Sequence, residues 1–150
     1  MAFILLADDD ELIVDVVRAA LNANGHVVGA VDDGKSVVAI VEAKQPDLVI
    51  LDCSMPEVSG IQALVAMRRS DRCCRIPVLM LTARLGEGDE DIAIRAGAQD
   101  YLRKPFDPEQ LVSRVEMLID RTARVARLAD NPGSANRPRS REALGWGQRA

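Results

Sequence analysis

Short apolar runs separated by amphipathic stretches are the main pattern along this chain. Four runs are nearly unbroken and rich in β-branched residues or leucine, which is typical of strands buried on both faces of a sheet. These runs are Phe3–Ala7, Val27–Val31, Leu48–Leu51 and Val78–Leu81, and Ala98–Leu102 is a weaker fifth. The pattern therefore predicts five short strands, each followed by room for a helix.

The intervening stretches carry apolar residues at helical spacing and signals for helix ends. The first predicted helix stops at Asn24-Gly25, the second runs from about Gly34 to Ala43, and the third contains Ile61, Leu64, Val65 and Met67. The fourth ends at Ala96-Gly97, and the fifth begins at Asp107-Pro108-Glu109. Five β-α units in about 120 residues predict a doubly wound parallel five-stranded sheet, with helices on both faces and right-handed crossovers.

The size and charge of the chain restrict the number of domains and the classes of function that it can have. One core-bearing domain is the default for 150 residues with 48% hydrophobic content. Residues 121–150 contain seven arginines against Asp130 and Glu142, so this tail carries +5 and residues 1–120 carry −9. An acidic body with 3% aromatic residues argues against direct nucleic-acid binding, because it offers neither phosphate neutralisation nor base stacking.

The basic tail is expected to lie outside the folded domain. We expect a folded domain over residues 1–120, with its last helix continuing to about residue 128. Residues 129–150 are expected to form a disordered tail or linker, because Asn131-Pro132-Gly133 and Pro138 interrupt any apolar periodicity. A coiled coil through the end of the last helix is a weaker alternative, since the heptads are few.

Three cysteines and the absence of a long apolar stretch indicate the compartment. Cys53, Cys73 and Cys74 are odd in number and two are adjacent, which suits reduced thiols better than a disulfide framework. The opening residues lack a basic leader, and no apolar stretch reaches membrane-spanning length. We therefore expect a cytoplasmic protein without a membrane segment.

Three carboxylates and a lysine stand where the predicted strands end. Asp8 and Asp9 follow the first apolar run, Asp52 follows the third, and Lys104 follows the last. Since ligands of open α/β sheets bind at the carboxyl ends of the strands, these side chains should meet at one edge. Crowded carboxylates repel one another unless a cation joins them. A hard divalent ion with a lysine for an incoming anion suggests phosphoryl transfer onto an aspartate.

Four segments, in this order, resemble the response-regulator receiver domain over roughly residues 3–120. They are Ile4-Leu-Leu-Ala-Asp8-Asp9-Asp10, Leu48-Val-Ile-Leu-Asp52-Cys-Ser-Met-Pro56 with Gly60, Val78-Leu-Met-Leu-Thr82-Ala83, and Ala96-Gly-Ala-Gln-Asp-Tyr101-Leu-Arg-Lys104-Pro105-Phe106. The resemblance implies a flavodoxin-like three-layer fold with strand order 2-1-3-4-5. It also implies a phosphorylation-activated switch of a two-component or phosphorelay system, which is a regulatory domain rather than an enzyme.

The resemblance assigns a chemical role to each residue of the acidic edge. Asp52 matches the phospho-acceptor, which takes a phosphoryl group from a partner's phosphohistidine. Asp9 matches a direct Mg²⁺ ligand and Asp8 a ligand through water, with Mn²⁺ as a substitute ion and the backbone carbonyl of Ser54 as a further ligand. Lys104 matches the lysine that neutralises the phosphoryl oxygens. Asp10 reads most simply as a helix cap.

The resemblance also implies a switch and partners. Thr82 matches the hydroxyl that turns toward the phosphoryl group, and Tyr101 the aromatic that moves with it. The implied partners are a sensor histidine kinase or histidine phosphotransfer protein, and a downstream protein bound on the face of the fourth helix, fifth strand and fifth helix. Family resemblance further implies a cis peptide bond before Pro105, although cis is rare for such bonds in general.

Departures and alternatives remain at this stage. The resemblance implies that Ser54 and Arg84, two residues after Asp52 and Thr82, flank the path of a hydrolytic water, and the sequence does not set the lifetime of the acyl phosphate. His26, the single histidine, starts the second strand away from the acidic edge and is a poor phosphodonor candidate. The chain fits a single-domain regulator of the chemotaxis kind or a receiver fragment of a longer regulator. A haloacid-dehalogenase-like phosphatase needs its nucleophile on the first strand, and a flavodoxin needs a phosphate loop where this chain has acids.

Overall fold

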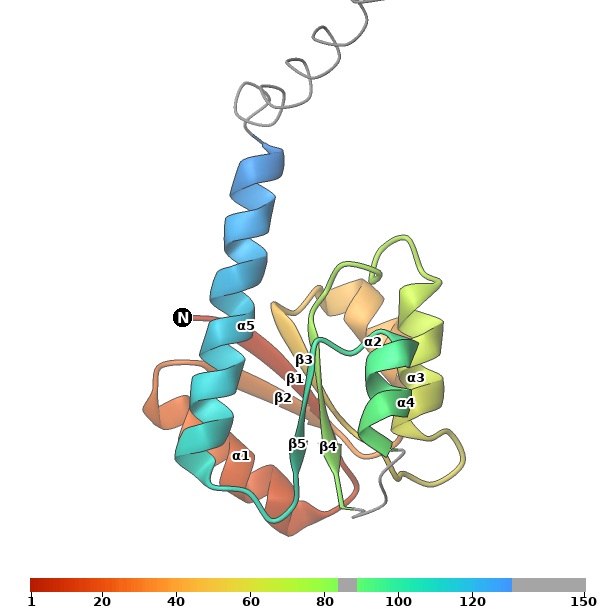
Figure 1. Ribbon diagram of the computed structural model, residues 1–150. Helices are drawn as coiled ribbons and strands as arrows, with labels where there is room; N and C mark the ends of the chain where they lie inside the picture. The colour runs from red at the N-terminus through yellow and green to blue at the C-terminus, as the bar shows by residue number, and fades with distance from the viewer. Residues whose placement is uncertain (84–88, 131–150) are drawn as a thin grey trace, which may run out of the picture. The chain divides into compact units, whose positions relative to one another are not determined.

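A computed structural model describes residues 1–83 and 89–130 of this chain. Five parallel strands alternate with five helices in these residues (Figure 1). The strands are β1 (Phe3–Ala7), β2 (Val27–Val31), β3 (Leu48–Asp52), β4 (Val78–Thr82) and β5 (Asp100–Arg103). The helices are α1 (Glu11–Ala23), α2 (Val37–Lys44), α3 (Gly60–Arg68), α4 (Asp89–Ala96) and α5 (Pro108–Ala129).

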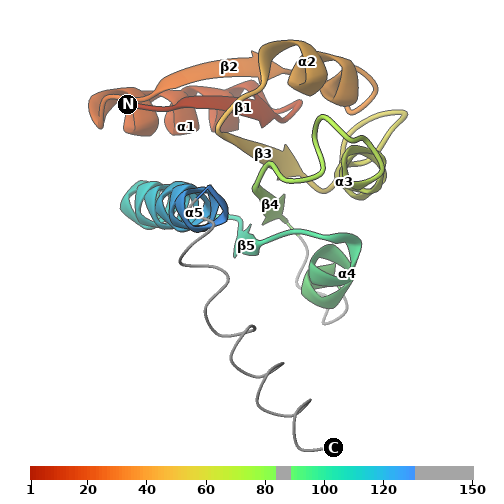
Figure 2. The same ribbon diagram turned by 90° about the horizontal axis from the view of Figure 1, so that it is seen from above.

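The strands form one sheet in the order β2-β1-β3-β4-β5, which confirms the predicted flavodoxin-like topology. All four strand pairs are parallel. Helices α1 and α5 cover one face of the sheet, and α2, α3 and α4 cover the other (Figure 2). Because every crossover returns the chain to the same edge, all five strands end at one side of the molecule.

Two hydrophobic clusters, one on each face, hold the three layers together. Alternate residues of the central strands point to opposite faces, so Leu5 and Leu51 join the cluster under α2, α3 and α4, while Leu6 and Ile50 join the cluster under α1 and α5. Strands β3 and β4 are buried along their whole length. This burial on both faces explains why their sequences are nearly continuous apolar runs.

Two elements begin later than the sequence pattern predicts. Helix α2 begins at Val37 rather than near Gly34, because the backbone N–H and hydroxyl of Ser36 both donate to Oδ1 of Asp33, at 2.8 and 2.9 Å, and hold these residues in a turn. Strand β5 begins at Asp100 rather than Ala98, because the N–H of Ala98 donates to the carbonyl of Ala93 and still closes α4. Local hydrogen bonds therefore override the apolar pattern at both places.

Helix α3 is positioned by a capping box that the sequence analysis did not single out. The hydroxyl of Ser59 accepts from the N–H of Gln62, and the side chain of Gln62 accepts from the N–H of Ser59. Gly60 follows directly, and a Cβ at this position would collide with the backbone carbonyl of Asp52. Only glycine lets α3 begin this close to the end of β3.

The chain divides into two units, residues 1–119 and 120–150. Helix α5 ends at Ala129, one residue beyond the predicted position, and the division into a domain and a tail stays a prediction. Within the second unit, Arg124 forms an ion pair of 2.8 Å with Asp120. Arg84 and the tail from residue 131, with its Trp146, lie outside the described residues. In the described part of the chain, no helix is long and apolar enough to cross a membrane.

Candidate phosphoryl-transfer site

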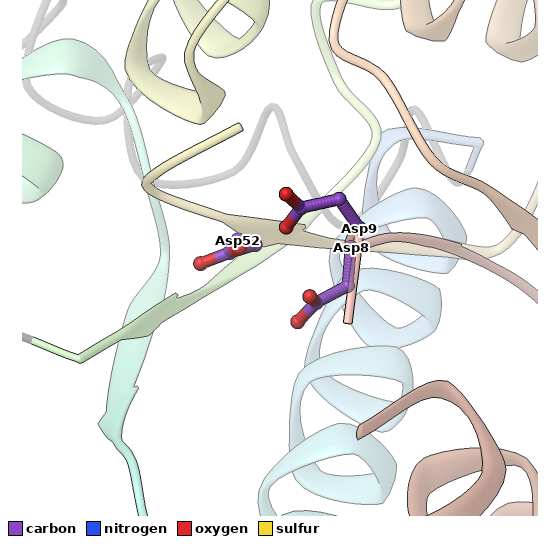
Figure 3. A group of neighbouring side chains, drawn as sticks. All are labelled: Asp8, Asp9 and Asp52. Atoms are coloured by element: carbon purple, nitrogen blue, oxygen red, sulfur yellow. The ribbon is translucent and has the colours of Figure 1, made fainter. Parts of the chain in front are cut away.

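Three carboxylates meet where β1 and β3 end, as the sequence predicts (Figure 3). Asp8 and Asp9 directly follow β1, and Asp52 is the last residue of the neighbouring β3. One oxygen from each of the three side chains lies within 4.8 Å of the other two. Asp8 and Asp52 are buried, whereas Asp9 is exposed to solvent. The cluster is therefore accessible to solvent at Asp9, whereas its other two carboxylates are enclosed by the protein.

Lys104 supplies positive charge to the two buried carboxylates. Its Nζ donates a hydrogen bond of 3.0 Å to Oδ2 of Asp8 and lies 3.3 Å from Oδ1 of Asp52. Burial lowers the pKa of Lys104, but the hydrogen bond to Asp8 and the charges of both aspartates together raise this pKa above its ordinary value. The ammonium therefore stays charged, and it balances one of the two buried negative charges.

The carboxyl group of Asp52 has a pKa well above its ordinary value. Burial, and then the nearby charge of Asp8, raise the pKa of Asp52 to about 6, while Lys104 and the backbone N–H of Ser54 act in the opposite direction. The N–H of Ser54 donates to Oδ1 of Asp52 at 3.3 Å. This carboxylate is thus held at a cost in free energy that a further cation would reduce.

Thr82 ends β4 beside this cluster, and its side chain is fully buried. Among the described residues, its hydroxyl has no hydrogen-bond partner. A buried hydroxyl without a partner is uncommon in folded proteins, because burial removes the hydrogen bonds that water would make. Within the described residues, Thr82 therefore has an unused donor at the carboxyl edge of the sheet, and its role in the switch stays a prediction.

Replacing Thr82 with valine is expected to raise the stability of the metal-free protein by about 1 kcal/mol, because an unsatisfied buried hydroxyl becomes a methyl group of the same shape. Urea denaturation in the presence of a chelator measures the change. Thr82→Ser is the matched control, since it keeps the hydroxyl and removes the methyl group. A valine variant no more stable than the wild type would mean that the hydroxyl is satisfied in the folded protein.

The end of β5 connects Thr82 to Lys104 through the backbone. The N–H of Lys104 donates to the carbonyl of Thr82 at 2.7 Å, and the Lys104–Pro105 peptide bond is cis, as the resemblance implied. Tyr101 lies opposite Met80 in the register of β4 and β5, is half-buried, and packs against the cluster under α2, α3 and α4. The site and the outer strand of the sheet are therefore directly linked.

Two further residues, one beside the site and one away from it, have the structural roles that the sequence suggested. The side chain of Asp10 accepts from the N–H of Leu12 at 2.9 Å and caps α1. His26 lies away from the acids: its Nδ1 accepts from the N–H of Ala2 at 3.2 Å, and its Nε2 lies 2.9 Å from Glu116. The role of the Ser54 carbonyl as a ligand stays a prediction.

An open hollow of about 740 Å³ adjoins the cluster between the ends of β1 and β2. Asp8 and Asp9 line it together with three further aspartates, a glutamate and Arg18. Asp52 does not line this hollow. The hollow cannot be recognised in the sequence, because its acids come from two loops and a helix that only the fold brings together. Its charge makes the approach to the cluster favourable for cations.

Comparison with known proteins agrees with this geometry. The family model described as the response regulator receiver domain matches residues 4–116. The DNA-binding dual master transcriptional regulator RpaA of Synechocystis sp. is 42% identical over 130 residues, which cover 86% of this chain and 54% of that protein. The transcriptional regulatory protein TrcR of Mycobacterium tuberculosis is 36% identical over 85% of this chain and 49% of its own length. The chain thus spans about half the length of these curated relatives.

A solved structure gives the same result in three dimensions. The receiver domain of a sensor histidine kinase from Pseudomonas aeruginosa, with a magnesium ion coordinated in its active-site cleft, superposes with a TM-score of 0.74. It is 32% identical, and the match covers 79% of this chain and 98% of that one. The matched family is that of the receiver domains, and not that of the phosphatases or the flavodoxins considered as alternatives. By sequence, topology and the placement of its acids, the chain belongs to the response regulator receiver domain family, whose members are signalling domains of two-component systems.

Proposed function

We propose that this chain is a phosphorylation-activated switch, in which Asp52 accepts a phosphoryl group from a phosphohistidine of a partner protein. The observation that carries this proposal is the set of charges at the end of β3. Asp52 is buried beside Asp8 and Asp9, and Lys104 contacts both buried carboxylates. A nucleophilic carboxylate, an excess of negative charge and a fixed ammonium are what Mg²⁺-dependent transfer onto aspartate needs.

The residues present fit a divalent cation. Asp8, Asp9 and Asp52 offer hard oxygen ligands within 4.8 Å of one another, and one ammonium does not balance three carboxylates. Together with the backbone carbonyl of Ser54, these side chains would hold Mg²⁺, or Mn²⁺ in its place. The bound ion would neutralise charge on the phosphoryl group during transfer.

The transfer itself is a displacement at phosphorus. A carboxylate oxygen of Asp52 attacks the phosphorus atom, the bond from phosphorus to the histidine nitrogen breaks, and its electron pair returns to the imidazole ring. The product is an acyl phosphate on Asp52. Lys104, held between Asp8 and Asp52, supplies positive charge to the phosphoryl oxygens. The same site would support limited self-catalysed phosphorylation from small donors and hydrolysis of the acyl phosphate.

The response of the protein is proposed to begin at Thr82. Its buried hydroxyl, which has no partner among the described residues, would donate to a phosphoryl oxygen on Asp52. Because Thr82 and Lys104 are joined by a backbone hydrogen bond, a movement there reaches β5 and the half-buried Tyr101. A change of about 1.4 kcal/mol would alter the ratio of two states tenfold. The face of α4, β5 and α5 would then bind a downstream protein differently.

The proposed partners follow from this chemistry. The phosphodonor would be a sensor histidine kinase or a histidine phosphotransfer protein in the cytoplasm. The matched relatives are named as transcriptional regulators and are about twice as long as the matched region. In such a context the signal would pass to an output domain, and DNA contact would belong to that domain rather than to the acidic receiver.

The experiment that tests the proposal is intact mass measurement after incubation with acetyl phosphate. The wild type in Mg²⁺ is expected to gain one phosphoryl group, and chelation of the metal should abolish the gain. Asp52→Ala should take up none, because no carboxylate remains at the end of β3. Asp33→Ala is a matched control on a neighbouring loop and should be phosphorylated normally. Uptake that persists in Asp52→Ala, or with chelator, would contradict the assignment.

A further inference from the structure

Arg68 is a partly buried cation that the proposed chemistry does not use. It is the last residue of α3 and lies at the edge of the sheet opposite the carboxylates, where β4 and β5 begin. Its guanidinium donates hydrogen bonds only to neutral oxygens among the described residues. These are the carbonyls of Gly97 (2.9 Å), Cys73 (3.5 Å), Cys74 (3.2 Å) and Ile76 (2.8 Å), and Oε1 of Gln99 (2.8 Å).

Two of these acceptors belong to the connection between α4 and β5. Gly97 follows α4 with a φ of 113°, and a Cβ there would lie 2.9 Å from Cγ and Nε of Arg68. The guanidinium therefore lies directly against the backbone of Gly97. Oε1 of Gln99 also accepts from the N–H of Val78 at 2.8 Å, so the same oxygen joins Arg68 to the first residue of β4. One side chain thus ties α3 and β4 to the end of α4.

The electrostatics of this contact favour a fixed position of the Arg68 guanidinium at the end of α4. The carbonyl of Gly97 lies at the C-terminal end of α4, where the helix dipole favours a positive charge. Because the guanidinium is planar and forked, it can donate to several acceptors at once, which a lysine ammonium cannot reproduce. The neighbouring Arg69 is exposed, so it differs from Arg68 in environment and not in charge.

The position of this contact relative to the proposed switch suggests its role. The chain passes from Thr82 to the N-terminal end of α4, along α4 to the contact at Gly97, and then into β5 with Tyr101. If the whole of α4 is free to move, a displacement that begins at Thr82 moves the helix and does not reach β5. If the C-terminal end of α4 is held, the displacement is transmitted to β5. The hydrogen bonds of Arg68 hold that end.

We propose that Arg68 is a positioning residue that fixes the C-terminal end of α4 and the start of β5, and thereby sets how strongly phosphorylation of Asp52 affects Tyr101. This inference rests on the proposed function for the phosphorylation step. Its structural part, the anchoring of α4, does not depend on phosphorylation. Arg68 is distant from the carboxylates along β4 and β5, so its loss should leave phosphoryl uptake intact.

The anchoring is tested in the unphosphorylated full chain by amide hydrogen exchange. The N–H groups of Gly97 and Ala98 donate to the carbonyls of Ile94 and Ala93, both at 3.0 Å, and report on the end of α4. Arg68→Met is expected to speed their exchange at least tenfold, whereas Arg69→Met should not change it. Equal exchange in the two variants would overturn the inference, whatever the outcome of the phosphorylation experiment.

The coupling is tested by the change in the Tyr101 amide NMR signal on incubation with acetyl phosphate and Mg²⁺, at a phosphorylated fraction measured by intact mass. Arg68→Met should reach the wild-type fraction but show at least a threefold smaller change at Tyr101. Arg68→Lys should be intermediate, and Arg69→Met should match the wild type. A loss of stability alone would not reduce the response of the folded, phosphorylated molecules.

A full Tyr101 response in Arg68→Met would overturn the inference while leaving the function of Asp52 in place. If Arg68→Met does not fold, Arg68→Lys provides the test, because it keeps the charge and the aliphatic stem but loses the forked donors that contact Gly97 and Gln99 together. A reduced Tyr101 response in Arg68→Lys supports the coupling, and an unchanged response contradicts it. Absence of phosphoryl uptake by the wild type would instead refute the proposed function, and the coupling with it.

Discussion

Replacing Lys104 with methionine is expected to destabilise the metal-free protein by about 3 kcal/mol, because two buried carboxylates lose the ammonium that contacts both of them. The methionine fills a similar volume, so the loss reports on charge rather than on packing. Urea denaturation at pH 7 with a chelator measures it. The same variant should take up phosphoryl groups far more slowly than the wild type, since no fixed cation then faces the phosphoryl oxygens.

The control for this experiment is Lys44→Met, at an exposed position near the end of α2. It should change stability by no more than about 0.5 kcal/mol, because exposed charges are screened by solvent. The double variant Asp8→Asn with Lys104→Met should recover part of the lost stability, since one unpaired charge is removed. A loss in Lys104→Met no larger than in Lys44→Met would mean that solvent already compensates the buried carboxylates.

Replacing Asp52 with asparagine is expected to stabilise the metal-free protein at pH 7, and the gain should disappear at acid pH. The pKa of Asp52 is raised to about 6 in the folded protein, chiefly by burial, whereas its ordinary value is 3.8. The folded state therefore binds this proton more tightly than the unfolded state. The carboxyl contributes most to stability below pH 4, and this contribution is lost as the pH rises through about 6.

The stability difference between Asp52→Asn and the wild type should accordingly grow between pH 4 and pH 7, by on the order of 1 to 3 kcal/mol. Denaturation curves at several pH values with chelator measure it. Saturating Mg²⁺ should reverse the order, because the wild type keeps all three carboxylate ligands and the variant does not. A difference that stays constant with pH would show that Asp52 titrates normally in the folded protein.

Burial on both faces of the sheet made the strands predictable. A strand such as β3 or β4 must be apolar at every position when helices cover both sides, and this composition is visible without any structure. The ends of these strands could also be predicted from the sequence, because a charged residue cannot continue such an apolar run. Asp8, Asp52 and Lys104 were therefore found from their places in the sequence, and the parallel topology required them to meet at one edge.

The different environments of the carboxylates in the acidic cluster could not be predicted without the fold. Asp8 and Asp9 are adjacent and chemically identical in the sequence, yet Asp8 is buried against Lys104 while Asp9 faces solvent. Successive residues of an extended chain point in opposite directions, and only the packed structure decides which direction is the interior. The raised pKa of Asp52 has the same origin, because burial and proximity to Asp8 are properties of the assembled site.

Arg68 shows most clearly what tertiary structure adds. Four of its five acceptors are backbone carbonyls. Because every residue carries a carbonyl, the sequence does not indicate which ones accept from Arg68. The start of β5 was misplaced for a related reason, since backbone hydrogen bonds at Ala98 prolong the end of α4. Side-chain chemistry and apolar periodicity can be read along the chain. Contacts made by the backbone of distant segments exist only once those segments are brought together.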